Sequence, residues 1–74
     1  MINVGDMVYI EREDRDWEES KNLVGMVGFV AYDGCGYYTI DFVNRKYDFM
    51  HGGGGHCSNR SAYNLDKKCV KKVR

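Results

Sequence analysis

Residues 27–43 read VGFVAYDGCGYYTIDFV, and this stretch decides the fold. Its centre, Asp33-Gly34-Cys35-Gly36, combines a turn-forming Asp-Gly pair with a second glycine. Glycine supplies the positive φ angles that tight hairpin turns require. The runs on either side are rich in β-branched and aromatic residues, which strands favour. The stretch therefore predicts a β-hairpin that turns at residues 33–36.

The return arm of this hairpin, residues 37–43, alternates between two faces. Successive side chains of a strand point to opposite sides, so every second residue shares a face. One face carries aromatic and aliphatic side chains, and burial in a core accounts for them better than contact with a partner. The core residues expected from the two arms are Phe29, Tyr38, Ile40 and Phe42.

Four further runs have the character of short strands. Residues 4–12 alternate with Val8 and Ile10 on one side, which is typical of a half-buried strand. The run that enters the hairpin contains Gly25 and Gly28, which suggest a bent or bulged strand. The expected strands are residues 4–12, 23–32, 37–43, 62–65 and 69–73.

Five short strands without an internal repeat or a linker predict a single all-β domain over residues 1–74. A chain of 74 residues buries a limited share of its surface, so its stability is expected to be modest. Residues 11–22 form a long polar first loop, and residues 44–61 form a glycine-rich loop before the last strands. The expected architecture is a small five-stranded antiparallel barrel.

Several short motifs resemble known small barrels. Gly5-Asp6-x-Val8 followed by Gly25-x-Val27-Gly28-x-Val30 resembles SH3-like barrels, especially their KOW and Tudor-like branches. Asp16-Trp17 and Tyr63-Asn64-Leu65-Asp66 are similar to the barrel domain of mind-bomb-type ubiquitin ligases. The overall order of strands, with a His-Gly-rich loop before the last ones, is similar to that of small phage and prophage accessory proteins. These resemblances imply an SH3-like barrel and an accessory protein that binds and inhibits a host protein, such as a defence nuclease.

Charge is divided between the two halves of the chain. The net charge is zero, yet residues 1–44 carry nine acids and three bases, and residues 45–74 carry eight bases and two acids. Either the halves neutralise each other in the fold, which we favour, or they create one acidic and one basic face. A net charge of zero argues against strong nonspecific binding to nucleic acid, which needs a basic footprint.

The remaining composition is typical of a cytoplasmic protein. The chain begins without a signal-peptide pattern and has no apolar run near the roughly 20 residues that span a bilayer. Its three cysteines, Cys35, Cys57 and Cys69, are an odd number at wide spacing, which is a poor disulfide framework. We therefore expect reduced thiols, a cytoplasmic location and no membrane partner.

The strap His51-Gly52-Gly53-Gly54-Gly55-His56-Cys57 joins coordinating groups to a flexible backbone. His51, His56, Cys57 and Cys69 are permitted zinc ligands, but the neighbours His56 and Cys57 rarely chelate one ion together, and no Cys-x2-Cys pair is present. Hydrolase, Walker, dinucleotide and deaminase motifs are also missing from the sequence. We therefore expect no metal, no cofactor and no catalytic residue.

The strap and the first loop are instead expected to form a non-enzymatic binding surface for a protein partner. Tyrosine and tryptophan combine a large contact area with a polar tip, and Tyr32 and Tyr37 are candidates of this kind. Trp17 stands in a run with six acids between residues 11 and 19, where it contacts a partner or caps the open end of the barrel. The predicted partner-binding residues are Trp17, Tyr47, His51, Gly53, Gly54, His56, Arg60 and Tyr63.

Two other functions remain open from the sequence. One is binding of nucleic acid or a nucleotide, because glycine-rich backbone can cradle phosphate beside basic side chains. Lysines on a terminal strand also protect a sheet edge from pairing, and this explanation is the one we favour for them. The other is a homo-oligomer built on exposed edges or oppositely charged halves. The candidate phosphate-binding residues are Arg45, Lys46, Lys67, Lys68, Lys71 and Lys72.

Overall fold

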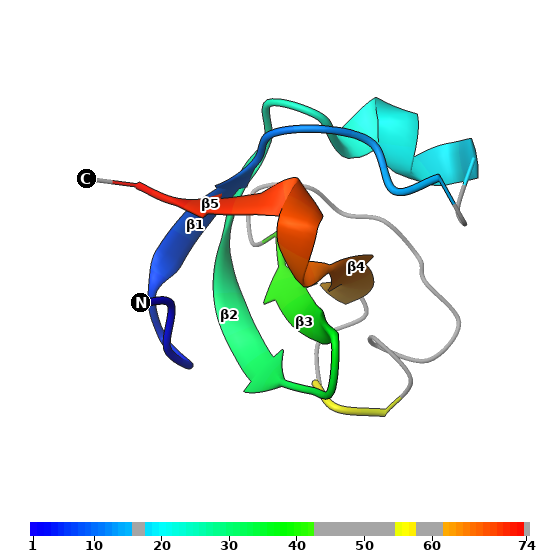
Figure 1. The fold of residues 1–74 in the computed structure, drawn as a ribbon. Helices are drawn as coiled ribbons and strands as arrows, with labels where there is room; N and C mark the ends of the chain where they lie inside the picture. Colours follow the sequence, from blue (N-terminus) through cyan, green and yellow to red (C-terminus); the bar gives the residue numbers. More distant parts are fainter. Residues whose placement is uncertain (16–17, 43–54, 58–61, 74) are drawn as a thin grey trace.

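In the computed structural model, five antiparallel strands form one sheet with the order β4-β3-β2-β1-β5 (Figure 1). The all-β class and the antiparallel pairing predicted from the sequence are confirmed. The structure describes residues 1–15, 18–42, 55–57 and 62–73. The elements are β1 Met7–Ile10, the 3-10 turn η1 Glu18–Leu23, β2 Val27–Asp33, β3 Tyr37–Asp41, β4 Ala62–Asp66, the 3-10 turn η2 Lys67–Cys69 and β5 Val70–Lys72.

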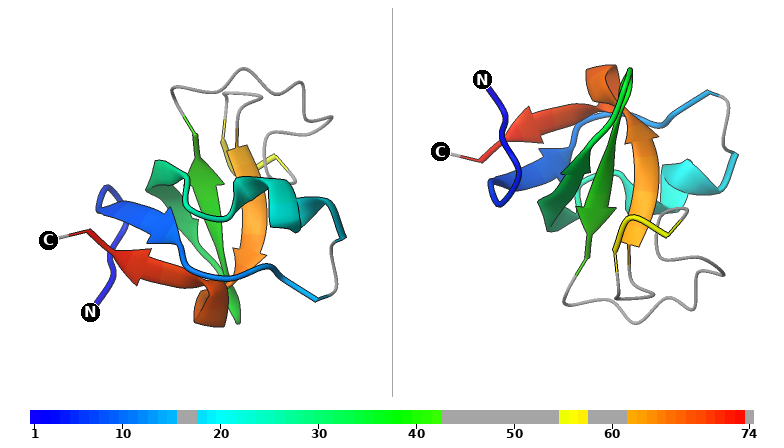
Figure 2. Two further views of the ribbon diagram at one scale, coloured as in Figure 1. Left: turned by 90° about the horizontal axis from the view of Figure 1, so that it is seen from above. Right: turned by 90° about the horizontal axis from the view of Figure 1, so that it is seen from below.

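The sheet is a four-stranded meander to which the last strand is added. Strands β1, β2 and β3 each pair with the next strand along the chain, and β5 returns to pair with β1. Figure 2 shows the sheet curving, with η2 carrying the chain from β4 to β5. The two edge strands are β4 and β5, and over the described ranges no ladder between them closes the sheet.

The β2–β3 hairpin forms where the sequence predicts it, but its turn lies slightly later. The N–H of Gly34 donates to the carbonyl of Tyr37 at 2.9 Å, so the ladder continues past Asp33. The tip is Cys35-Gly36, and the positive φ of 82° falls on Gly36. Asp33-Gly34 therefore belongs to the end of the ladder, and the second glycine makes the turn.

A register shift in β2 decides which side chains face outward near the hairpin. Val30 pairs with Ile40, but Tyr32 pairs with Thr39, so one extra residue lies between them. Because side chains alternate with a period of two, a shift of one residue moves all later side chains to the opposite face. Tyr32 therefore points outward and is 38% exposed. The bulge confirms the expected irregularity, at Ala31 rather than at the glycines.

The core fills the inner face of the curved sheet. Phe42 and Ile40 are fully buried there, as the alternation of the hairpin predicts. Both 3-10 turns contribute, η1 through Leu23 and η2 through Cys69. The buried apolar cluster comprises Val8, Ile10, Leu23, Val30, Tyr38, Ile40, Phe42, Tyr63, Leu65, Cys69 and Val70.

Phe29 lies on the outer face and is 37% exposed, so its assignment to the core is wrong. In β2 the inward positions are Gly28 and Val30. The methyl Cγ2 of Ile40 occupies the space beside Gly28, 2.7 Å from where a Cβ would stand. A small residue at this inner position thus lets β3 pack closely, and the large aromatic ring next to it points outward.

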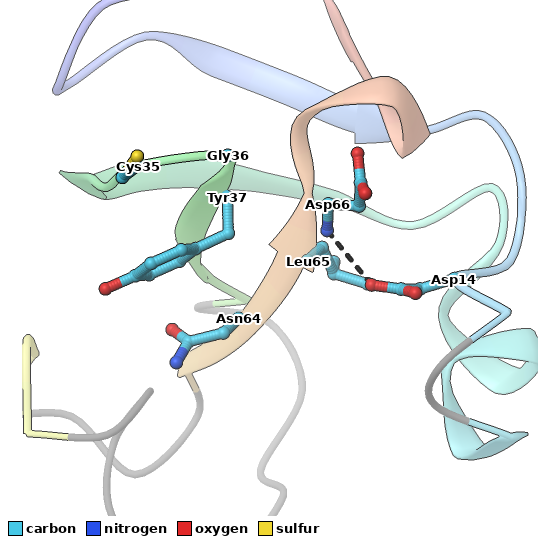
Figure 3. A pocket seen from close by; sticks show the side chains of 7 residues that line it. All are labelled: Asp14, Cys35, Gly36, Tyr37, Asn64, Leu65 and Asp66. Atoms are coloured by element: carbon cyan, nitrogen blue, oxygen red, sulfur yellow. Dashed lines mark hydrogen bonds between the residues drawn. The ribbon is translucent and has the colours of Figure 1, made fainter.

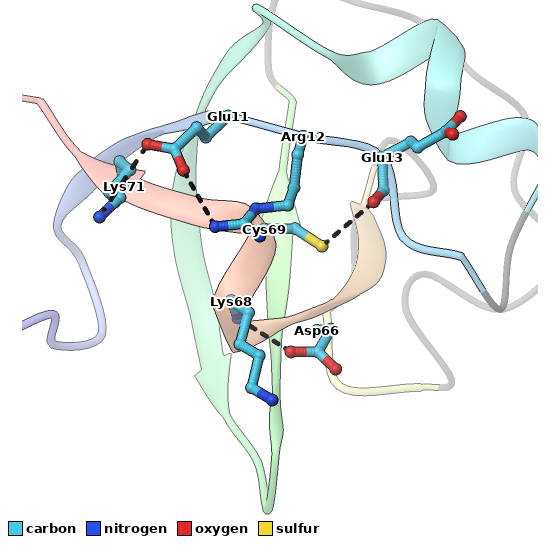
Figure 4. Close-up of polar contacts among 7 residues, drawn as sticks. All are labelled: Glu11, Arg12, Glu13, Asp66, Lys68, Cys69 and Lys71. Atoms are coloured by element: carbon cyan, nitrogen blue, oxygen red, sulfur yellow. Dashed lines mark hydrogen bonds and ion pairs between the residues drawn. The ribbon is translucent and has the colours of Figure 1, made fainter.

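In the described residues, three ion pairs join the acidic half of the chain to the basic half, as expected if the halves neutralise each other. Three lysines from the basic half lie near carboxylates from the acidic half, and Figure 4 shows one of these contacts on β5. The pairs, measured from Nζ to a carboxylate oxygen, are Lys67–Asp33 at 2.6 Å, Lys71–Glu11 at 3.9 Å and Lys72–Asp6 at 3.4 Å.

The carboxylate of Asp6 makes folding sensitive to acid. The backbone N–H of Asn3 donates to its Oδ2 at 2.8 Å, and this bond, with the nearby Lys72, lowers the pKa of Asp6 below its ordinary value. A lowered folded pKa stabilises the native state above the unfolded pKa, and the contribution is lost as pH falls through the folded value. We expect Asp6→Asn to flatten the fall in Tm below about pH 4, where aspartate titrates. Thermal melts of both proteins between neutral and strongly acidic pH test this, and parallel curves would contradict it.

Candidate functional site

An aromatic cluster of Tyr32, Tyr37 and His56 lies on the outer face of the β2–β3 hairpin. The imidazole of His56 stacks on the ring of Tyr32, with ring centroids 3.8 Å apart and planes inclined by 2°. The hydroxyl of Tyr37 lies 2.9 Å from Nε2 of His56. The cluster therefore joins the described end of the glycine strap, residues 55–57, to the hairpin.

Local backbone features position each member of this cluster. The register shift in β2 turns Tyr32 outward, and the ring of Tyr37 lies against Gly34 at the start of the turn. On the strap, the thiol of Cys57 donates a weak hydrogen bond to Oδ2 of Asp41, with 3.9 Å from Sγ to the oxygen. Residues 55–57 are thus held at both the hairpin and the end of β3.

The chemistry of the cluster suits recognition of a surface. An imidazole and two phenols combine flat apolar faces with polar tips, which is the composition of protein-contact surfaces. The tautomer of His56 decides the direction of its bond to Tyr37. An Nε2 without a proton accepts the phenol O–H, whereas an Nε2 that carries a proton donates it to the phenol oxygen. Either form presents aromatic surface to solvent.

A hollow of about 280 Å³ adjoins the cluster at the tip of the hairpin. Figure 3 shows side chains from the first loop, the hairpin and β4 around it. Tyr37 lines this hollow and is also hydrogen-bonded to His56, so the hollow and the aromatic cluster share a side chain. The lining residues are Asp14, Cys35, Gly36, Tyr37, Asn64, Leu65 and Asp66.

Asp14 fixes the first loop to the end of β4 and is only 8% exposed. Its Oδ2 accepts the backbone N–H of Asp66 at 3.1 Å, as Figure 3 shows. Its own N–H donates to Oγ of Ser20 at 2.8 Å, and that hydroxyl donates back to the carbonyl of Asp14 at 3.1 Å. A buried carboxylate is tolerated when hydrogen bonds replace its lost hydration. No local sequence motif marks Asp14 as an anchor, because its partner Asp66 is distant along the chain.

The three thiols are free and occupy different environments. Cys69 is buried, its Sγ lies 3.6 Å from the carbonyl oxygen of Glu13 (Figure 4), and burial raises the pKa of its thiol. A buried thiol with a raised pKa is a poor nucleophile. Cys57 is half-buried, whereas Cys35 is exposed at the hairpin tip beside the hollow.

The structure places two of the predicted partner-binding residues. His56 lies in the aromatic cluster, whereas Tyr63 lies in the core at 8% exposure and offers little surface to a partner. The other predicted positions fall outside the described residues, and they are Trp17, Tyr47, His51, Gly53, Gly54 and Arg60.

Some of the candidate phosphate-binding residues also lie within the described residues, and others do not. Arg45 and Lys46 fall outside the described residues. Lys67 is paired with Asp33, which raises the pKa of the lysine, and its Nζ also lies 4.8 Å from the centre of the Tyr38 ring. Lys71 and Lys72 face the carboxylates named above, and the backbone N–H of Lys68 donates to Oδ1 of Asp66 at 2.8 Å. Binding of nucleic acid stays a prediction.

Two classes of site have no representative in the part of the chain that the structure describes. No group of three or more His, Cys, Asp or Glu side chains in these ranges could hold a metal ion. Among the same residues, no helix has the length and apolar character needed to cross a membrane. Comparison of the whole chain with protein-family models, with curated proteins and with solved structures finds no match.

Proposed function

We propose that this protein is a non-enzymatic protein-binding module, and that the aromatic cluster and the adjoining hollow together form its partner-binding site. The observation that carries the proposal is the position of Tyr37, which lines the hollow and hydrogen-bonds to His56. This arrangement makes one continuous surface from the first loop, the hairpin, β4 and the strap. A surface built from aromatic rings around a polar hollow fits a protein segment better than it fits a small substrate.

The same proposal includes an SH3-like fold. Supporting it are the strand order β4-β3-β2-β1-β5 and the 3-10 turn η2 between the last two strands. The narrower role that the phage resemblance implies, inhibition of a host protein such as a defence nuclease, stays a prediction. Identification of the bound partner would test that role.

The lining of the hollow favours a basic side chain from the partner. Two of its lining residues, Asp14 and Asp66, are acidic, and Asn64 adds an amide. One oxygen of each carboxylate accepts a backbone N–H, from Asp66 and from Lys68 respectively. Carboxylates accept hydrogen bonds from guanidinium or ammonium groups, and charged donors strengthen such bonds. The ring of Tyr37 at the rim adds a surface over which a cation is attracted. We therefore propose an extended partner segment that inserts an arginine or lysine, with apolar neighbours against the aromatic cluster.

Selection of peptides from a random library on the immobilised protein tests this function. We expect the selected peptides to carry arginine or lysine, and to bind Asp66→Asn and His56→Ala about tenfold more weakly, a loss of about 1.4 kcal/mol. Asp66→Asn keeps an oxygen that can accept the N–H of Lys68, so the fold should survive. Glu18→Gln is the matched control, because the Glu18 side chain is 91% exposed and does not line the hollow. Enrichment of acidic peptides, or equal affinity for all variants, would contradict the proposal.

A further inference from the structure

The register of β4 shows which of its backbone groups point away from the sheet. β4 is an edge strand, with β3 as its neighbour on one side. The N–H of Lys67 donates to the carbonyl of Gly36 at 3.1 Å, so this pair is hydrogen-bonded. Opposite residues of an antiparallel ladder alternate between hydrogen-bonded pairs and pairs whose backbone groups point to the outer sides. Counting back along β4, the backbones of Asp66 and Asn64 therefore face its free edge.

The contact made by Asp14 agrees with this orientation. Its Oδ2 accepts the N–H of Asp66, so the first loop occupies that edge position in place of a neighbouring strand. Two residues earlier, the N–H and carbonyl of Asn64 have no such partner among the described residues. The side chain of Asn64 is engaged separately, because its Oδ1 accepts the hydroxyl of Thr39 at 2.6 Å. One donor and one acceptor of the main chain thus remain open at this edge.

The open position at Asn64 adjoins the hollow. Asn64 and Asp66 line the hollow, and so does Asp14, which bonds to the free edge itself. Figure 3 shows Tyr37 on one side of β4 and Asp14 on the other, so the hollow reaches from the hairpin to the edge. A residue added opposite Asn64 would place its side chain on the same face of the sheet as the Asn64 side chain. That side chain would lie over the hollow.

We propose that the partner segment binds as an added β-strand at the free edge of β4, where one of its residues forms a pair of backbone hydrogen bonds with Asn64. This inference rests on the proposed function and specifies how the segment lies. The paired residue is the arginine or lysine whose side chain enters the hollow. Main-chain bonds then supply affinity for any extended segment, and the hollow selects the side chain, which is the division of roles in recognition by strand addition.

The open groups select an extended segment as the occupant. A single residue can satisfy both the N–H and the carbonyl of Asn64 only in an extended chain, because the backbone groups inside a helix are bonded to one another. The acidic lining residues Asp14 and Asp66 complement a basic side chain on that segment. Since Asp14 already holds the N–H of Asp66, pairing stops beside Asn64, and the added strand is short.

Amide hydrogen exchange at Asn64 tests whether this edge is open. In the free protein we expect the Asn64 amide to exchange about tenfold or more faster than the Leu65 amide, which faces β3. Binding of the tightest peptide from the selection described above should slow exchange at Asn64 by a similar factor. The Leu65 amide is the internal control. Slow exchange at Asn64 in the free protein, or no added protection in the complex, would overturn the proposal.

Methylation of single backbone nitrogens in that peptide tests the pairing itself, because it removes one donor and keeps every side chain. We expect methylation at the arginine or lysine to weaken binding about tenfold, since its N–H donates to the carbonyl of Asn64. The matched control is methylation of the next residue, whose N–H points away from β4 and whose loss should change the affinity by less than about threefold.

The outcomes separate this inference from the function on which it rests. Equal losses at the two methylated positions, or no loss at either, would overturn the added strand. The proposed function would still stand in that case if the unmethylated peptide bound Asp66→Asn and His56→Ala more weakly than the wild-type protein. A selection that yields no binding peptide would contradict the proposed function and this inference together.

Discussion

Phe42→Ala is expected to lower the free energy of unfolding by about 3–5 kcal/mol, the usual cost of removing a buried phenylalanine ring. Phe42 is fully buried on the inner face, so the truncation leaves a cavity in the core. A domain of this size has a total stability of about 5–15 kcal/mol at most, so the loss removes a large part of it. Urea denaturation followed by tryptophan fluorescence or circular dichroism measures the change.

Phe29→Ala is the matched comparison, because it deletes the same ring from the opposite face of the sheet. Phe29 is 37% exposed, so we expect a loss below about 1 kcal/mol when the protein is kept dilute. If Phe42→Ala is too unstable to give a folded baseline, Phe42→Leu should lower the free energy of unfolding by a smaller amount that can still be measured. Equal losses for the two alanine variants would show that the assignment of inner and outer faces is wrong.

The sequence predicts the strands of this protein because alternation is a local property. Val8 and Ile10, and Ile40 and Phe42, each follow a period of two, and all four are buried. The turn shows the limit of such reasoning. Asp-Gly pairs are strong hairpin signals, but the following Cys35-Gly36 offers the same chain reversal two residues later, and the positive φ falls on Gly36.

Faces are harder to predict than strands. Phe29 and Val30 are neighbouring apolar residues, and the sequence alone favours burial of Phe29, which has the larger side chain. Gly28 changes the outcome, because β3 packs closely against it and fixes the inward positions of β2. The bulge after Val30 then turns Tyr32 outward. Neither event has a local signature strong enough to assign the face of each aromatic ring.

The sequence indicates Tyr32 and Tyr37 as contact candidates and His56 as a partner-binding residue, but it does not predict that the two tyrosine rings meet at His56. Its partners Tyr32 and Tyr37 lie 24 and 19 positions away in the chain, and only the fold brings their rings together. The anchor formed by Asp14 on the N–H of Asp66 spans 52 positions. Contacts at such separations depend on the register of the whole sheet, so the pattern of a single segment cannot predict them.

Gly28→Ala is expected to destabilise the fold by about 1–3 kcal/mol, the usual cost of adding atoms to a packed interior. A Cβ at this position would stand 2.7 Å from the backbone oxygen of Asp41 and 2.7 Å from Cγ2 of Ile40. The methyl could rotate away, but the carbonyl belongs to β3 and moves only with the strand. Each kcal/mol lowers Tm by about 4–8 °C in a domain of this size, so a thermal melt measures the effect.

Gly36→Asn tests the positive φ angle of a glycine separately from the steric crowding at Gly28. Gly36 has a φ of 82°, and a Cβ placed there meets nothing within 4 Å. Asparagine adopts positive φ more readily than most residues, so we expect a loss of less than about 1 kcal/mol. A mild effect from both substitutions would contradict the close approach of β3 to Gly28.

A large effect from Gly28→Ala should also reach the binding surface, because Asp41 accepts the thiol of Cys57 and a shift of β3 would displace that contact. The amide resonances of Cys57 and His56 in Gly28→Ala therefore report whether the packing of β2 against β3 positions the aromatic cluster.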